Sequence, residues 1–374
     1  MTVPIYFDNA ATTAIEPRVK QAIVEAMELD GNPSSSHALG RKSKAAIEAA
    51  RSQVAKLMGC QAGELIYTSG GTEADNLAIL GVVESGKVKS IISSPIEHPA
   101  IVDSIKKAQK LFGIDVFYVK HQSNGDVDYS SLKELLQQHP NSLVSLMHVN
   151  NEIGNILDVQ KVGGLCREFD SIFHTDMVQS IGHFPINLSE LTVDLASCSS
   201  HKIHGPKGNG FLYRKKGISL TPQSNGGKQE REARGGTENL VGIIGFSKAL
   251  EIALSEMAEI NATVLELKKY FISQIHTHFP TASFNGRSGD IENSVNSVVN
   301  VNFSDANNDM VLFQLDLKGI YVSGGSACSS GAASGSHVLN TLGITGASIR
   351  FSFCKENTKE EIDQVLTVLK ETIN

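Results

Sequence analysis

Residues 64–83 read ELIYTSGGTEADNLAILGVV and combine three features in one stretch. LIYT has the length and apolar character of a short buried strand, SGG is a flexible turn, and ADNLAILGVV has the composition of a helix. A strand that leads through a turn into a helix is the repeating unit of a mostly parallel sheet covered by helices. The stretch therefore predicts an α/β fold.

The turn itself has two interpretations. A glycine-rich turn that opens a helix presents free N–H groups and the positive end of the helix dipole, which favour a phosphate. Thr72 and Glu73 could equally serve only as helix caps. The turn is not a Walker loop, because no Gly-Lys-Ser/Thr follows it.

The same alternation extends from about residue 17 to residue 260. Helical segments separate short apolar runs, which are KSIISSP (89–95), IDVFYVK (114–120), LVSLMHVN (143–150), SIFHTDM (171–177) and LASCSSHK (195–202). After about residue 248 the pattern changes to a long helical segment, strand-like SVNSVVNVNF and IRFSF, and a final amphipathic helix. We expect a large α/β domain over residues 15–256, and a smaller α+β domain formed by residues 1–14 and 257–374.

Composition excludes several classes of protein. The 374 residues are 41% hydrophobic and 20% charged, with a net charge of −7, which argues against binding to nucleic-acid phosphates. No apolar run could cross a membrane, and residues 1–17 lack signal-peptide and transit-peptide patterns, so we expect a cytoplasmic protein. The cysteines are odd in number, scattered and without a CxxC pair, so neither a disulfide framework nor a metal site is predicted; they are Cys60, Cys166, Cys198, Cys328 and Cys354.

Polar clusters follow the predicted strands, where open α/β sheets bind ligands. Lys202 comes after the apolar run VDLAS, and partial desolvation there would make its amine a nucleophile for Schiff-base chemistry, although most lysines in polar loops lie on the surface. Asp176 ends the run SIFHTD and could keep a pyridine nitrogen protonated, or only cap a helix. His98 in EHPA could stack on a cofactor ring, and Asn151 in HVNNEIG could donate to a phenolic oxygen, or each could be structural.

Cys328 has an unusual sequence context. Residues 323–336, SGGSACSSGAASGS, contain four glycines and six serines around this one cysteine. Its thiol is expected to be exposed and mobile, and an exposed thiol is usually avoided unless it has a use. The other interpretation is a Gly/Ser linker with an incidental cysteine.

Taken together, these segments resemble the cysteine desulfurase family, in the branch of the iron-sulfur assembly and nitrogen-fixation enzymes. The resemblance extends over nearly the whole chain and rests on ten motifs in the family's order, which are YFDNAATT, GNPSSSH, YTSGGTEADNLAI, EHPAI, HVNNEIG, HTDMVQS, SSHKIHGPKG, RGGTEN, SGGSACSSG and SIRFSF.

The resemblance implies a fold-type-I enzyme with a mainly parallel, seven-stranded sheet and pyridoxal 5'-phosphate (PLP) as its cofactor. Lys202 would bind the cofactor covalently, Asp176 would pair with the pyridine nitrogen, and His98 would stack on the ring. Gln179 and Asn151 match the positions that hydrogen-bond the phenolic oxygen. The residues that match the phosphate-binding cup are Gly71, Thr72, Ser199 and His201.

The resemblance also implies the reaction and its partners. Arg350 would bind the carboxylate of L-cysteine, with Asn32 and Asn151 in the same pocket, and Cys328 would accept the sulfur as a persulfide. Thr237 matches a residue that reaches the phosphate of the other subunit, which implies a homodimer. The persulfide would then pass to an acceptor protein in iron-sulfur cluster assembly or tRNA thiolation.

The chain departs from the family pattern in three places. Met177 stands where Ala or Gly is common, the segment after Cys328 lacks the usual Leu-Glu-Pro-Ser, and Cys198 is an additional cysteine without an assigned role. The alternatives are a selenocysteine lyase, a small-amino-acid aminotransferase, a non-catalytic sulfur-relay subunit, or a phosphate-binding protein built around SGGTE. None of them requires a cysteine in a Gly/Ser segment together with Lys202, Asp176, His98 and Arg350.

Overall fold

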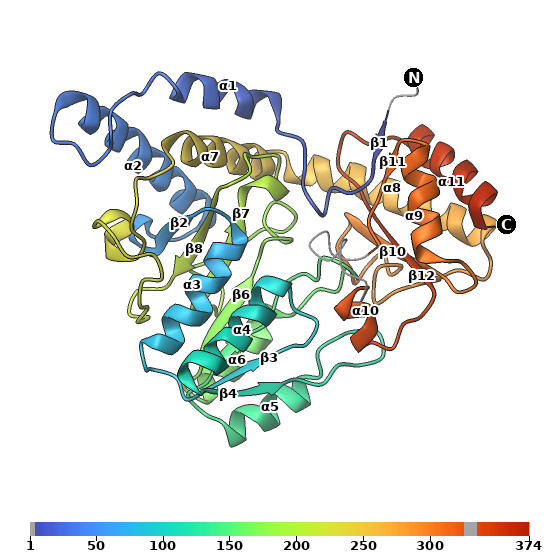
Figure 1. Cartoon of the computed structure of the whole chain (residues 1–374), viewed down its shortest axis with the longest axis horizontal. Coiled ribbons are helices and arrows are strands. Elements are labelled where there is room, and N and C mark those ends of the chain that lie inside the picture. The colour runs from blue at the N-terminus through green and yellow to red at the C-terminus, as the bar shows by residue number, and fades with distance from the viewer. Residues whose placement is uncertain (1–3, 325–334, 374) are drawn as a thin grey trace.

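The chain folds into two lobes that lie side by side (Figure 1). The computed structural model describes residues 4–324 and 335–373, so Cys328 lies outside the described residues. In this part of the chain, no helix is both long and apolar enough to cross a membrane.

A seven-stranded sheet forms the centre of the larger lobe. Its order is β2 (Leu65–Thr68), β8 (Gly210–Arg214), β7 (Leu195–Ser199), β6 (Ile172–Asp176), β5 (Leu143–Ser145), β3 (Ser90–Ser93) and β4 (Asp115–Tyr118). Five adjacent strands, from β7 to β4, are parallel, and only β8 runs antiparallel to its neighbours. The predicted α/β fold with a mainly parallel sheet is confirmed.

Helices cover both faces of this sheet (Figure 1). α3 (Gly71–Glu84) and α4 (Pro99–Phe112) pack on one face, where their apolar residues meet Ile91, Leu143 and Leu195. The opposite face is covered by α2 (Ala38–Met58), α5 (Tyr129–Gln138), α6 (Val159–Glu168) and α7 (Leu240–Ser255), with α1 (Pro17–Ala26) against α7. Burial on both faces explains why the strands are short, apolar runs without alternation.

The smaller lobe has a core of its own. β10 (Val298–Phe303) lies between β9 (Ser283–Phe284) and β12 (Ala347–Ser352), all antiparallel, and packs with α8 (Met257–His278), α9 (Asn308–Leu317) and α11 (Lys359–Ile373). β1 (Ile5–Tyr6) pairs in parallel with β11 (Ile320–Tyr321), which brings the start of the chain to this lobe. α10 (His337–Thr341) packs against Ile96 and Ile153 of the large lobe. α7 ends and α8 begins at the boundary we propose between the two domains.

A buried ion pair attaches the loop before α7 to the large lobe. Arg51 on α2 donates to both carboxylate oxygens of Glu230, at 2.8 and 2.7 Å, and the side chains of both residues are at most 3% exposed. Glu230 also accepts the backbone N–H of Tyr67 at 2.9 Å, so the pair links α2, β2 and the loop that carries Thr237. Removing one partner of such a buried ion pair leaves the other charge unpaired in the core, which destabilises the fold.

We therefore expect Arg51→Met to lower the free energy of unfolding by about 3 kcal/mol, because Glu230 would be left charged and unpaired in the core. Urea unfolding followed by circular dichroism measures this loss. The double variant Arg51→Met/Glu230→Gln should recover part of it, because the remaining side chain is neutral. A loss below about 1 kcal/mol in the single variant would contradict the assignment.

Candidate active site

A cavity of about 150 Å³ lies beyond the carboxyl ends of β6 and β7. It is lined by ten of the predicted site residues, which are Gly71, Thr72, His98, Asn151, Asp176, Gln179, Ser199, His201, Lys202 and Arg350. Strands, helix N-termini and the small lobe all contribute to this lining, so residues as far apart in the sequence as Ala10 and Arg350 share one pocket. This placement follows the general rule for ligand sites in open α/β sheets.

Lys202 enters the cavity from the short helix η2 (Ser200–Lys202), which directly follows β7. Its Nζ donates hydrogen bonds to the carbonyl oxygens of Ala10 and Ala11, at 2.5 and 2.8 Å. The N-terminal segment therefore fixes the position of the amine.

Asp176 is the last residue of β6 and is 5% exposed. Burial raises the pKa of its carboxyl to about 6, while the N–H of Val178, at 2.8 Å, and the charge of Lys202 oppose that rise. A carboxylate in this environment is stabilised by a cation placed next to it, such as a protonated ring nitrogen.

His98 caps the N-terminus of α4, where its Nδ1 accepts the N–H of Ala100 at 3.1 Å. Burial lowers the pKa of its imidazole to about 4, and the nearby charges of Lys202 and His337 add to the effect. His98 is therefore a neutral aromatic ring in the wall of the cavity at pH 7.

The N-terminus of α3 forms another wall. The first α-helical hydrogen bond runs from the N–H of Ala74 to the oxygen of Gly70, which leaves the amides of residues 71–73 directed away from the helix. Next to them, the buried Ser199 hydroxyl has no partner among the described residues. A Cβ on Gly71 would lie 2.7 Å from the Val178 side chain, so the backbone comes closer here than another residue would allow.

His201 and Gln179 are held by the N-terminal segment. The Nδ1 of His201 lies 3.1 Å from the Thr12 hydroxyl, and the Nε2 of Gln179 donates to the oxygen of Ala10 at 2.9 Å. Burial lowers the pKa of His201 to about 4, with the charges of Lys202 and Lys207 contributing. The ring is neutral, so it can donate or accept one hydrogen bond at the cavity.

Arg350 reaches the cavity from β12 in the small lobe and is 1% exposed. Its guanidinium donates to the oxygen of Asn151 at 2.9 Å and to the carboxylate of Asp8 at 2.8 Å, while its buried Nε has no partner among the described residues. A guanidinium held in this way is suited to a small carboxylate.

Three predicted residues lie elsewhere. Asn32 is exposed in the loop between α1 and α2, where its Oδ1 accepts the N–H of Ser34. Thr237 is exposed and lines a separate cavity beside Ser69. Cys328 is outside the described residues. The roles of Asn32, Thr237 and Cys328 stay predictions.

The structure adds residues that the sequence analysis did not assign. Asp8 and the carbonyls of Ala10 and Ala11 belong to YFDNAATT, whose many small and polar residues were the only signal. Asp75 also lines the cavity, although its position inside a helical pattern gave no sign of this. Met177 is fully buried in the core, and Val178, which the sequence favoured over Met177 as the residue facing the ring, lines the cavity.

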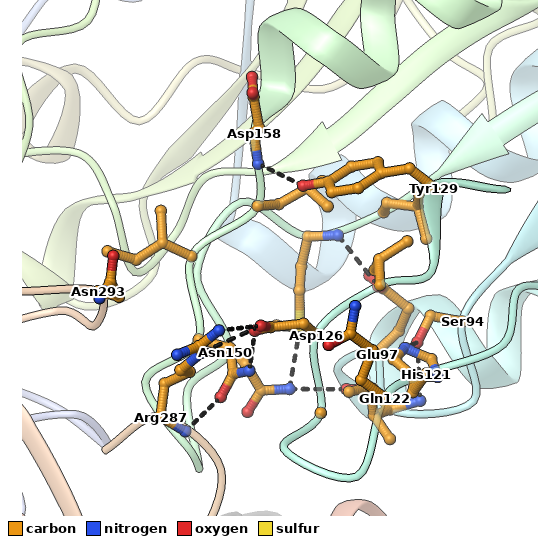
Figure 2. Close-up of a pocket in the computed structure, with 18 of the residues that line it drawn as sticks. Ser94, Glu97, His121, Gln122, Asp126, Tyr129, Asn150, Asp158, Arg287 and Asn293 are labelled. Carbon is orange, nitrogen blue, oxygen red and sulfur yellow. Dashed lines mark hydrogen bonds and ion pairs between the residues drawn. The ribbon is translucent and has the colours of Figure 1, made fainter. Parts of the chain in front are cut away.

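A larger cavity of about 410 Å³ lies next to this site, between the two lobes (Figure 2). Arg287 crosses it to reach Asp126, with an Nη2 to Oδ2 distance of 2.6 Å. None of the described residues that line it is a lysine, so it offers no amine for a covalently bound aldehyde. Met147 lines both cavities, which makes the larger one a neighbour of the candidate active site.

Comparisons with known proteins agree with this geometry. Residues 5–365 match the family model of aminotransferase class-V. The chain is 42% identical to cysteine desulfurase IscS of Dictyoglomus turgidum, over 99% of this chain and 94% of that protein, and 40% identical to cysteine desulfurase IscS of Methanosarcina thermophila, over 99% and 92%. This chain belongs to the cysteine desulfurase family.

A solved structure agrees with the family assignment. A NifS-like protein that is 35% identical to this desulfurase superposes with a TM-score of 0.90 and covers 99% of both chains. The family and the class of enzyme predicted from the sequence are therefore confirmed. Cys198, the additional cysteine of this family member, is fully buried in the core, where burial raises the pKa of its thiol.

The raised pKa of Asp176 predicts how the stability of the cofactor-free desulfurase depends on pH. A carboxyl whose pKa is about 6 when folded, against an ordinary 3.8, binds its proton more tightly in the folded state, so stability falls as pH rises from about 4 to above 6. Asp176→Asn removes this dependence. We expect the variant to gain up to about 3 kcal/mol over the parent apoprotein at pH 7.5 and to lose that gain at pH 4. Urea unfolding at both pH values measures it, and equal stability at pH 7.5 would contradict the environment described for Asp176.

Proposed function

We propose that the protein is a PLP-dependent cysteine desulfurase that converts L-cysteine to L-alanine and passes the sulfur to Cys328. The observation that carries the proposal is the meeting of Lys202, Asp176 and Arg350 in one buried cavity. These three groups suit, respectively, an aldehyde, a protonated ring nitrogen and a substrate carboxylate. The family assignment supports the same reaction.

The residues in the cavity fit PLP. Lys202 would bind its aldehyde, Asp176 would accept a hydrogen bond from the ring nitrogen, and the neutral ring of His98 would cover one face. The phenolic oxygen would receive hydrogen bonds from Gln179 and Asn151. The unpartnered hydroxyl of Ser199 lies beside the free amides of residues 71–73, and with Thr72 and His201 it would hold the phosphate.

The bound cofactor would supply an electron sink for the electrons that are released when the substrate loses its α-proton. Lys202 Nζ, which the carbonyls of Ala10 and Ala11 hold in place, is suited to accept and return that proton. Arg350 would bind the carboxylate of L-cysteine through its unpartnered Nε and orient the substrate, with Asn151 beside it. Asn32 belongs to the same proposed substrate pocket, although it does not line the cavity of this chain.

Sulfur transfer would take place at Cys328. Its thiolate attacks the sulfur of the substrate, an S–S bond forms as the C–S bond breaks, and the carbon skeleton takes up a proton and leaves as L-alanine. The products are one alanine and one Cys328 persulfide, so no external oxidant or reductant is needed. A reducing compartment such as the cytoplasm would keep the thiol available, and an acceptor protein would then take the sulfur.

We expect Cys328→Ser to bind PLP and to show a change in cofactor absorbance with L-cysteine, but to form almost no alanine and no persulfide, because a hydroxyl cannot replace the attacking thiolate. Lys202→Ala is the matched variant: it should lose both the covalently bound cofactor and the absorbance change while keeping its fold. Alanine release and mass spectrometry of the persulfide measure the outcome. Parent-like alanine formation in Cys328→Ser would favour a lyase or transferase that does not use this thiol, and a persulfide on another cysteine would reassign the acceptor.

We also propose a homodimer in which Thr237 completes the phosphate site of the partner subunit. Thr237 is exposed, so a partner subunit can contact it. The buried Arg51–Glu230 pair attaches its loop to the large lobe and holds the loop in place. Among the described residues, Thr237 lines a separate cavity and not the candidate active site of its own subunit.

We expect sedimentation to show a dimer, and Thr237→Val to weaken PLP binding about tenfold without dissociating it, because one hydrogen bond to a charged phosphate is lost. Fluorescence titration of the apoprotein with PLP measures this affinity. Thr221→Val, at a half-buried threonine of the same loop, is the control and should bind PLP like the parent. An active monomer that retains PLP would contradict the shared site.

A further inference from the structure

The face of the sheet under α3 is arranged in three layers. Ile91, Leu143, Ile172 and Leu195 belong to the apolar cluster that packs with α3. Two residues further along each of these four strands lie Ser93, Ser145, His174 and Ser197, all fully buried, and they form the polar layer. Asp176 pairs with Ser197 across the strands, and Asp176 and Ser199 line the cavity. A polar layer therefore separates the apolar core from the candidate cofactor site.

The polar layer is a continuous chain of hydrogen bonds. Ser93 donates to the oxygen of Ser145 at 2.8 Å, and the Ser145 hydroxyl lies 2.9 Å from the Nδ1 of His174. The Nε2 of His174 lies 3.0 Å from the hydroxyl of Ser197. Burial lowers the pKa of His174 to about 3, so its ring is neutral and carries one N–H between two hydroxyl groups.

Asp75 covers this chain from the second turn of α3. It is 1% exposed and lines the cavity, and its Oδ1 lies 3.7 Å from the Nε2 of His174, too far for a hydrogen bond. That oxygen has no hydrogen-bond partner among the described residues. A buried carboxylate with an unpartnered oxygen is costly, whereas a carboxylic acid carries no charge.

The surrounding charges favour the acid. Asp75 faces the carboxyls of Asp176 and Glu97 and the neutral ring of His174. Two cations line the cavity: Lys202 acts on Asp176 and His98, and Arg350 is paired with Asp8. Burial and the charge of Asp176 raise the pKa of Asp75 well above its usual range, and Ser197 opposes this only in part. Burial and Asp176 raise the pKa of Glu97 in the same way. With Arg350 paired to Asp8, the single charge of Lys202 cannot neutralise the three buried carboxylates of Asp75, Glu97 and Asp176, so two of them keep their protons.

We propose that Asp75 is a positioning residue for Asp176: as an uncharged carboxylic acid it packs beside Asp176 and covers the Ser197–His174–Ser145 hydrogen-bond chain. Asp176 is then the single negative charge beside the ring nitrogen, and the layer beneath it is neutral and fully packed. The inference rests on the proposed function only for the identity of the group that Asp176 faces.

The protonation state of Asp75 can be tested in the cofactor-free protein. Infrared spectra at pH 7 should show the C=O absorption of protonated carboxylic acids, and part of it should disappear in Asp75→Asn. Glu97→Gln is the matched control, because it removes the other predicted acid and should remove a separate part of the same absorption. This measurement needs no turnover, so it holds whether or not the protein desulfurates cysteine.

The positioning role is tested by PLP affinity, read by fluorescence titration. Asp75→Asn keeps the size and neutrality of the acid and should bind PLP within about threefold of the parent, whereas Asp75→Ala opens the layer to water and should lose at least about tenfold. Circular dichroism checks that both variants fold. Two outcomes would overturn the proposal. One is that Asp75→Asn loses absorption of a carboxylate and keeps all the absorption of the carboxylic acids. The other is that Asp75→Asn and Asp75→Ala lose PLP affinity equally.

Discussion

The site depends on the meeting of a buried carboxyl and a half-buried amine at adjacent strand ends. Asp176 ends β6 and Lys202 follows β7, and the parallel pairing of these strands brings both into one cavity. The carboxylate of Asp176 depends on this pairing, because burial raises its pKa and only the positive charge of Lys202 and one backbone N–H oppose that rise. The polar layer under α3 lies next to Asp176, and the N-terminal segment accepts the hydrogen bonds of Lys202.

The small lobe completes the site by supplying a cation from a different core. Arg350 lies in the middle of β12, fully buried, and its guanidinium connects Asn151 of the large lobe with Asp8 of the N-terminal segment. The N-terminal segment in turn pairs with β11 and provides the carbonyls that receive the Lys202 amine. The N-terminal segment therefore contacts both Arg350, proposed to bind substrate, and Lys202, proposed to bind the cofactor. A shift of the small lobe would move both residues.

The segment that contains Cys328 is attached at both ends to this same region. Ser323 exchanges backbone hydrogen bonds with Arg350, and Ser336 donates to the buried carboxylate of Glu152 while it caps α10. The Nε2 of His337 lies 2.8 Å from the oxygen of Glu97, one residue before His98. The described chain on either side of Cys328 thus contacts elements that carry residues proposed to bind cofactor and substrate.

The sequence alone determined the α/β fold, the family, and the residues that line the cavity from strand ends and glycine-rich turns, because short apolar runs and local motifs are read along the chain. Met177 shows the limit of that information: the motif marked it as a departure and favoured Val178 as the residue that faces the site, but only the packed structure places Met177 in the core. The roles of Asp75 and Asp8 could not be predicted from the sequence either, because the residues that surround them are far away along the chain. Tertiary structure decided which charges face one another and which are buried, because electrostatic interactions and desolvation depend on distance in space and not on spacing along the chain.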